Sequence, residues 1–140
     1  MRLQFNQCTH VVADSQTIER KGVARTFPTG GLNLGVTTFD GANVWVVNKL
    51  QNTLAKIRAS DGALLGTFAT PTNVSAMAFD GTSIWTANRD DGTLSRIDPT
   101  TGVIVATVQV TGTLGVGAGP TGVAFDGLYL WVVAFEGGKV

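Results

Sequence analysis

An internal repeat constrains the fold of this chain more than any other feature of its sequence. The segments "TTFDGANVWVVNKLQNTL", "MAFDGTSIWTANRDDGTL" and "VAFDGLYLWVVAFEGGKV" align without gaps, so that Phe39, Phe79 and Phe125 coincide. The second segment follows the first by 40 residues, and the third follows the second by 46. A period of this length is typical of repeat architectures, in which each unit buries its apolar face against the next one.

Each repeat unit predicts four short β-strands. In the unit from Val74 to Val110 the strands are "SAMAF", "IWTAN", "TLSRID" and "VIVATVQV". Asp80 and Gly81 fit a hairpin turn after the first strand, and Pro99 ends the third strand because proline cannot donate to a sheet. The preceding unit repeats this order as "VTTF", "VWVVN", "TLAKIR" and "ALLGTF". The sequence therefore predicts an all-β chain.

The second strand of each unit indicates how the units pack. "VWVV" and "YLWVV" are apolar at consecutive positions, so both faces of this strand are expected to be buried. A four-stranded meander covered on both faces needs a similar neighbour on each side, as in the blades of a β-propeller. The rival fold is a β-sandwich, which would bury one face of each strand and would need no repeat of this length.

One stretch carries a family resemblance. The sequence "ANRDDGTLSRIDPTTGVIVATVQVTG…GPTGVAFDGLYLWVV" resembles the blades of bacterial YVTN-type propellers and of the related virginiamycin B lyase-like propellers. The resemblance extends over about residues 22–140. It implies that the first strand of each blade lines a central channel. It also implies that the loops between second and third strands share a face with the connections between blades, where ligands of such propellers commonly sit.

Counting strands predicts about three blades. We expect one propeller repeat domain over residues 1–140, divided into degenerate N-terminal strands (1–30), two blades (31–73 and 74–119) and a half blade (120–140). The N-terminal segments "TIER" and "GVARTF" resemble a third and a fourth strand, so they could supply what the half blade lacks. Because known rings have about 4–8 blades, two explanations stay open. The chain is a piece of a longer propeller, or copies associate, for example as a homodimer with a six-bladed ring.

The loops between second and third strands hold the candidate binding residues. These loops read "NKLQN", "NRDDG" and "AFEGG", and the blade fold does not require their differences. Since loop residues on a rigid scaffold commonly carry function, we expect a small molecule or protein to bind at this face. The candidate residues are Lys49, Arg89, Asp90, Asp91, Phe135 and Glu136.

Other repeated or unusual residues have structural explanations. The Phe-Asp-Gly triplets fit hairpin turns, and the tryptophan six residues after each phenylalanine is expected in the core between blades. The glycine-rich segment "TGTLGVGAGP" precedes a strand, whereas a dinucleotide-binding loop precedes a helix. We therefore interpret this segment as an enlarged connection between blades.

The sequence contains little catalytic equipment. His10 is the single histidine and lies outside the clear repeats, whereas lyases that resemble this family use histidines and a divalent metal. We therefore predict a non-catalytic binding or assembly module that needs no cofactor and no metal. The alternative is a fragment or relative of a lyase or lactonase propeller whose catalytic residues are absent here.

Charge and hydropathy exclude some partners. Ten basic and ten acidic residues cancel, which argues against a nucleic-acid partner. No apolar run approaches the about 20 residues of a membrane span, and no signal peptide is visible, although relatives are often exported. The lone Cys8 excludes an internal disulfide and leaves the cellular compartment undetermined.

Overall fold

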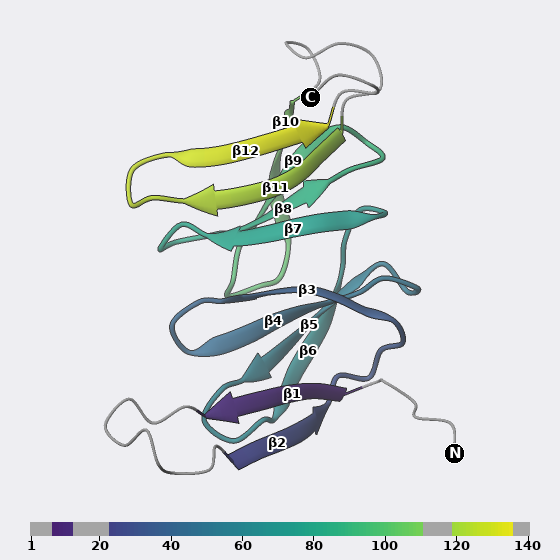
Figure 1. The fold of residues 1–140 in the computed structure, drawn as a ribbon, viewed down its shortest axis with the longest axis vertical. Coiled ribbons are helices and arrows are strands. Elements are labelled where there is room, and N and C mark those ends of the chain that lie inside the picture. Colours follow the sequence, from purple (N-terminus) through teal and green to yellow (C-terminus); the bar gives the residue numbers. More distant parts are fainter. Residues whose placement is uncertain (1–6, 13–22, 111–118, 136–140) are drawn as a thin grey trace.

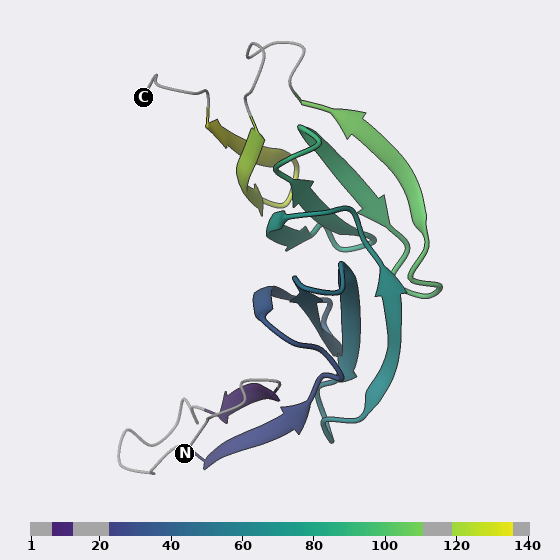
Figure 2. The ribbon, with the colours of Figure 1, turned by 90° about the vertical axis from the view of Figure 1, so that its right-hand side faces the viewer.

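The structure, a computed structural model, is an arc of antiparallel β-sheets stacked face to face (Figures 1 and 2). It describes residues 7–12, 23–110 and 119–135. Every regular element in this part of the chain is a strand. The strands are β1 (Gln7–Val12), β2 (Val23–Pro28), β3 (Leu34–Phe39), β4 (Asn43–Asn48), β5 (Thr53–Arg58), β6 (Leu64–Ala69), β7 (Val74–Phe79), β8 (Ile84–Asn88), β9 (Thr93–Ile97), β10 (Ile104–Gln109), β11 (Gly119–Phe125) and β12 (Leu130–Phe135).

Two sheets are complete four-stranded meanders. One has the strand order β3-β4-β5-β6 and the other the order β7-β8-β9-β10. Within each sheet, all neighbouring strands are antiparallel. These are the two blades that the repeats predict. In Figure 2 the first strands β3, β7 and β11 lie on the inner side of the arc, and the fourth strands β2, β6 and β10 lie along its convex side.

The two ends of the arc are hairpins. β1 pairs with β2 at one end, and β11 pairs with β12 at the other. The chain thus has about three blades in total, and it belongs to the all-β class. β2 confirms the strand predicted in "GVARTF". Its partner is Gln7–Val12, whereas "TIER" lies outside the described residues.

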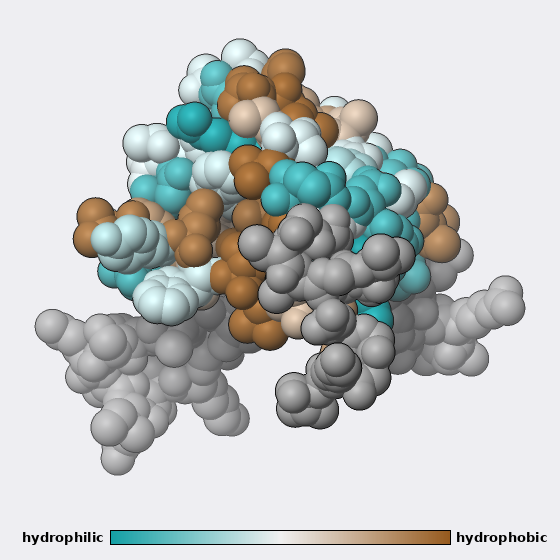
Figure 3. All heavy atoms as spheres, turned by 90° about the horizontal axis from the view of Figure 1, so that it is seen from above, coloured by the Kyte–Doolittle hydropathy of each residue, from teal (hydrophilic) through white to brown (hydrophobic). Residues whose placement is uncertain are grey.

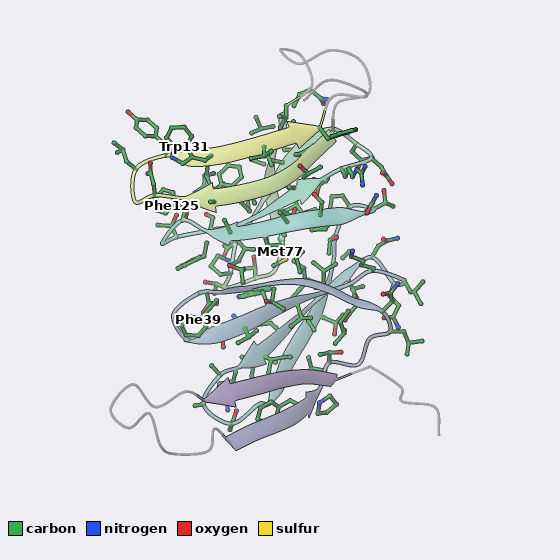
Figure 4. The ribbon with its side chains drawn as sticks, viewed as in Figure 1. Phe39, Met77, Phe125 and Trp131 are labelled. Carbon is green, nitrogen blue, oxygen red and sulfur yellow. The ribbon has the colours of Figure 1, made fainter. Side chains whose placement is uncertain are left out.

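The core lies between the two complete blades. A cluster formed by the first blade's Trp45, Val47 and Leu54 and the second blade's Val74, Met77, Ile84 and Ile97 is almost completely buried. The side chain of Met77, on β7, lies on the side of that strand that faces β3 (Figure 4). Both faces of β4 are largely covered, as its consecutive apolar residues predict. The same prediction is wrong for β12, where alternate residues are exposed because no further sheet of the described chain covers that face.

A glycine–phenylalanine contact repeats between successive sheets. Gly62, in the turn between β5 and β6, lies against the ring of Phe27 on β2. Gly102, in the turn between β9 and β10, lies in the same way against Phe68 on β6. Both glycines have positive φ, 75° and 71°, and neither has space for a Cβ atom. The contact identifies β2 as the structural counterpart of β6, one blade earlier in the stack.

In residues 7–12, 23–110 and 119–135, no helix has the length and hydropathy needed to cross a bilayer.

Candidate functional site

The turns between second and third strands lie at one side of the arc, on the right in Figure 1, together with the connections between blades. The side chains of Lys49, Arg89, Asp90 and Asp91 are all exposed in these turns. Phe135 ends β12 on the same side and is 51% exposed. Glu136, the remaining candidate, lies outside the described residues, as does most of the glycine-rich segment (111–118). We call the side that carries these turns the loop face.

Two cationic side chains of the loop face, Lys49 and Arg89, lie close to glycines of first strands. A Cβ atom on Gly35 of β3 would meet the aliphatic stem of Lys49 at 2.7 Å from Cε. A Cβ atom on Gly119 of β11 would collide with the backbone and Cγ of Arg89. First strands line the inner side of the arc, so these glycines let both side chains approach it. The sequence repeats alone do not indicate this role for glycine.

Asp90 is tied to the connection between blades. Its Oδ1 accepts a hydrogen bond of 2.8 Å from Asn73 Nδ2, and the Arg89 amide donates to the Asn73 carbonyl at 3.2 Å. Asn73 itself has φ of 50°, a left-handed conformation that asparagine tolerates better than most residues. The structure therefore holds Asp90 at the start of its loop, beside Arg89.

Buried asparagines lie beneath two of these loops, and sequence reasoning missed them. Asn48 Nδ2 donates to Thr53 Oγ1 at 3.1 Å, and Asn88 Nδ2 donates to Thr93 Oγ1 at 3.0 Å. The repeated asparagine at the end of "VWVVN" and "IWTAN" is the sequence feature that could have indicated them. Asn48 Oδ1 is buried with no hydrogen-bond partner among the described residues.

The turns on the opposite side confirm the structural explanation of the Phe-Asp-Gly triplets. Asp80 Oδ1 accepts hydrogen bonds from the Thr82 and Ser83 amides at 2.8 and 2.7 Å. Gly81 has φ of 93°, as an Asp-Gly hairpin turn requires. Asp40 and Asp126 accept the equivalent amide hydrogen bonds in their own turns.

Each turn aspartate also holds its tryptophan, a contact that the sequence analysis did not foresee. The indole Nε1 of Trp85 donates to Asp80 Oδ2 at 2.7 Å, and Trp45 bonds Asp40 at the same distance. Partial burial acts to raise the pKa of Asp80, but these hydrogen bonds outweigh it and lower that pKa to about 2. The pKa of Asp40 is lowered by the same balance of burial and hydrogen bonding. These carboxylates are therefore structural acceptors, held ionised.

The prediction that all three tryptophans lie in the core is wrong for Trp131. Trp45 is 0% exposed and Trp85 is half-buried, whereas Trp131 is 61% exposed. Trp45 faces the next blade, where Met77 and Ile84 cover it. Trp131 belongs to the last sheet of the described chain, and it lies on the uncovered side of β12 (Figure 4). The local sequence around Trp131 matches that of the other repeats, so it does not explain the difference in exposure. The difference follows from the position of this sheet at the end of the described stack.

Trp131 is part of an exposed apolar end. Leu128, Tyr129, Val133 and Phe135 are each more than half exposed beside it. Hydrophobic side chains are visible when the stack is viewed from this end (Figure 3). Tyr129, Leu130 and Trp131 line a shallow, open hollow of about 360 Å³. We call Leu128, Tyr129, Trp131, Val133 and Phe135 the β12 end. Isolated exposed apolar residues are ordinary on protein surfaces, whereas these five lie close together on one hairpin.

In the ranges 7–12, 23–110 and 119–135, no three His, Cys, Asp or Glu side chains gather closely enough to hold a metal ion. The described part of the chain has one ion pair, Arg58 Nη1 to Asp61 Oδ2 at 2.9 Å, on the surface. Among its described residues, the loop face presents the cations Lys49 and Arg89, the carboxylates of Asp90 and Asp91, and the Phe135 ring.

Comparison with known proteins supports the fold. No protein-family model and no curated protein matches the sequence. Among solved structures, the chain is similar to a catalytically inactive virginiamycin B lyase from Staphylococcus aureus with quinupristin, at 19% identity and a TM-score of 0.67 over 94% of this chain and 42% of that one. It is similar to a streptogramin B lyase at 18% identity and a TM-score of 0.68, over 93% of this chain and 42% of the other.

A third similar structure is a proposed 6-phosphogluconolactonase from Bacteroides uniformis. The identity is 16% and the TM-score 0.68, over 91% of this chain and 43% of that one. The chain therefore spans about two fifths of the length of these three proteins. At such identities the likeness concerns the fold alone. Together with the four-stranded blades, it shows that this chain has a β-propeller fold.

Proposed function

We propose that this chain is a non-catalytic propeller module that associates with copies of itself and binds a small molecule or protein on its loop face. One observation carries the assembly part. The β12 end exposes side chains whose counterparts in the first blade are buried: Val47 is 2% exposed and Val133 is 65% exposed. Leaving such a surface in water is unfavourable, at about 25 cal/mol for each Å² of apolar area.

The loop face supports the binding part of the proposal. Lys49 and Arg89 project from turns that rigid blades hold in place, and Asp90 is fixed by Asn73. The set offers cations, carboxylates and an exposed aromatic ring, Phe135, for recognition of a polar or charged ligand. Acid–base catalysis would instead need a donor and an acceptor within hydrogen-bond reach of a reacting group.

Mass measurement in solution tests the assembly. Sedimentation velocity across a range of concentrations should give a species of twice 14.6 kDa. A monomer at every concentration would reject self-association. Turnover of a small substrate that is lost in Lys49→Ala or Arg89→Ala, but kept in a core variant of similar stability, would reject the non-catalytic assignment.

A propeller enzyme of lyase or lactonase type is the second candidate. Two of the similar structures are lyases and a third is a proposed lactonase, and each is more than twice as long as the matched segment. On this alternative, catalytic residues would lie on blades outside this sequence. A reading frame that continues past Val140 with further Phe-Asp-Gly…Trp units and histidines would favour it.

A further inference from the structure

We propose that β12 of one copy pairs with β1 of a second copy, with Trp131 opposite His10 and Val133 opposite Cys8. This inference rests on the proposed self-association and specifies its surface and register. Two such junctions join two copies into one ring of six blades.

The two ends of the arc carry the two halves of a blade. β11 and β12 occupy the positions of a first and a second strand, and β1 and β2 those of a third and a fourth. β12 pairs only with β11, and β1 only with β2, among the described strands. Each therefore has an open edge where a complete blade has its central pairing, β4 with β5 or β8 with β9. Open edges of this kind readily pair with another chain.

These two edges cannot meet within one copy. β1 and β12 lie at opposite ends of the arc (Figures 1 and 2). One copy contributes about three blades, two copies contribute six and three copies nine. Since known propellers have about 4–8 blades, two copies are the number that closes a ring. A head-to-tail contact of this type gives a closed assembly when its rotation completes the circle.

The complete blades define the register of the junction. Trp45 pairs with Lys56, and Trp85 with Arg96. Trp131 is the counterpart of these tryptophans, so its partner is the β1 residue that matches Lys56 and Arg96. The glycine contact makes Phe27 on β2 the counterpart of Phe68 on β6.

Phe68 pairs with Leu54, which lies two residues before Lys56. Phe27 pairs with Cys8, which lies two residues before His10. Cys8 therefore matches Leu54, and His10 matches Lys56. Because Leu54 pairs with Val47, Cys8 is placed opposite Val133. His10, placed opposite Trp131, occupies the position that is basic in both complete blades.

The side chains exposed at the two ends match the contact between the complete blades. Trp45 and Val47 of the first blade form one core cluster with Met77 of the second, and Phe79 packs against that cluster. At the junction, Trp131 and Val133 are the counterparts of Trp45 and Val47. Phe39 of the second copy is the counterpart of Phe79. Phe39 is 52% exposed in a single copy, and Trp131 is 61% exposed. Each end therefore exposes the residues that the other end would cover.

A disulfide tests the register directly. Residues directly opposite in an antiparallel pair have Cα atoms about 4.5 or 5.5 Å apart, and both separations lie in the range that a disulfide spans. In Val133→Cys, mild oxidation should link the introduced thiol to Cys8 of a second copy, and most of the chain should run at twice 14.6 kDa without reductant. Peptide mass spectrometry should identify the linkage to Cys8.

Val132→Cys is the matched control. Residue 132 neighbours 133, but its side chain points to the other face of the strand, so the variant should give no linkage to Cys8. The double variant Val133→Cys with Cys8→Ser should also give none. Val133 is 65% exposed, so its replacement does not disturb the core of a single copy.

The possible outcomes distinguish the strand register, the pairing between copies and self-association itself. A dimer by sedimentation that links through Val132→Cys, or through neither variant, overturns the register and leaves self-association standing. A linkage formed within single chains overturns pairing between copies. A monomer at all concentrations overturns both the junction and the assembly part of the proposed function.

Discussion

The indole Nε1 of Trp131 donates a 2.6 Å hydrogen bond to Asp126 Oδ2, the same contact that holds the buried Trp45 against Asp40. The pKa of Asp126 is lowered mainly by the hydrogen bond from the Tyr129 amide, and also by this bond from Trp131. The last repeat therefore orients its tryptophan as the first repeat does, although nothing in the described chain covers it. On the proposed assembly, this exposed ring already has the geometry in which it would pack against a sheet of a second copy.

Replacing equivalent tryptophans should have different effects at the two ends of the stack. Trp45→Ala should lower the free energy of unfolding by about 3–5 kcal/mol, since it leaves a cavity between two blades. Trp131→Ala should leave the unfolding of an isolated copy almost unchanged and should weaken self-association. Urea unfolding, combined with sedimentation at several concentrations, separates the two effects. Equal losses of unfolding free energy in both variants would contradict this prediction.

The packing glycines give a second comparison. In Gly102→Ala a methyl group would meet the Phe68 ring, and φ of 71° would be strained. In Gly81→Ala the strain is similar, with φ of 93°, but there is open space around the new methyl group. We expect a loss of about 1–2 kcal/mol for Gly81→Ala from backbone strain. Overpacking should add about 1–3 kcal/mol for Gly102→Ala.

A double-mutant cycle identifies the source of the difference. In a Phe68→Ala background the ring is absent, so Gly102→Ala should then cost no more than Gly81→Ala. Denaturant unfolding of the four variants measures this. If the cost of Gly102→Ala is unchanged when the ring is removed, the contact between sheets is not its cause.

The sequence predicts the repeating parts of the molecule well because they depend on local patterns. Short apolar strand segments, Asp-Gly turns and the proline after β9 together indicate the two complete blades. Asp80 and Gly81 lie in a hairpin turn, as predicted. Contacts between sheets were not predictable in this way. The contact of Phe27 with Gly62 and the approach of Arg89 to Gly119 join residues 30 or more positions apart.

The positions of the candidate binding residues could be predicted only in part. The repeat alignment correctly placed Lys49, Arg89, Asp90 and Asp91 in exposed turns, because differences between repeat units mark loops. The exposure of Trp131 could not be predicted from its own repeat, since its local sequence is that of a core strand. Exposure depends on whether another blade follows, and this information lies outside the repeat.

The depressed pKa of Asp80 predicts acid sensitivity. Its folded value of about 2 lies below the unfolded value of about 3.9. The stabilisation from this carboxylate is therefore complete above about pH 4, and it is lost as the pH falls towards 2. Asp80→Asn should reduce the free energy of unfolding at pH 7 by at most about 2 kcal/mol, because solvent screens a partly exposed carboxylate.

The difference between wild type and Asp80→Asn should shrink between pH 4 and pH 2, since protonation makes the wild-type side chain neutral as well. Urea unfolding at intervals of half a pH unit measures this. A difference that stays constant over that interval would show that the ionised form of Asp80 contributes nothing to stability.

Deletion of residues 1–28 should cause aggregation instead of giving a smaller soluble protein. The deletion removes β1 and β2, and with them the ring of Phe27 that packs on Gly62. It also removes the strand proposed to pair with β12, so that the apolar edge around Trp131 and Val133 stays open in every copy. Light scattering and size-exclusion chromatography of the purified variant should show particles much larger than a dimer.

Deletion of residues 1–6, which precede β1, is the matched control and should leave the oligomeric state as in the wild type. If the chain lacking residues 1–28 stays soluble with the wild-type oligomeric state, β1 and β2 take no part in assembly, and the pairing of β12 with β1 is wrong.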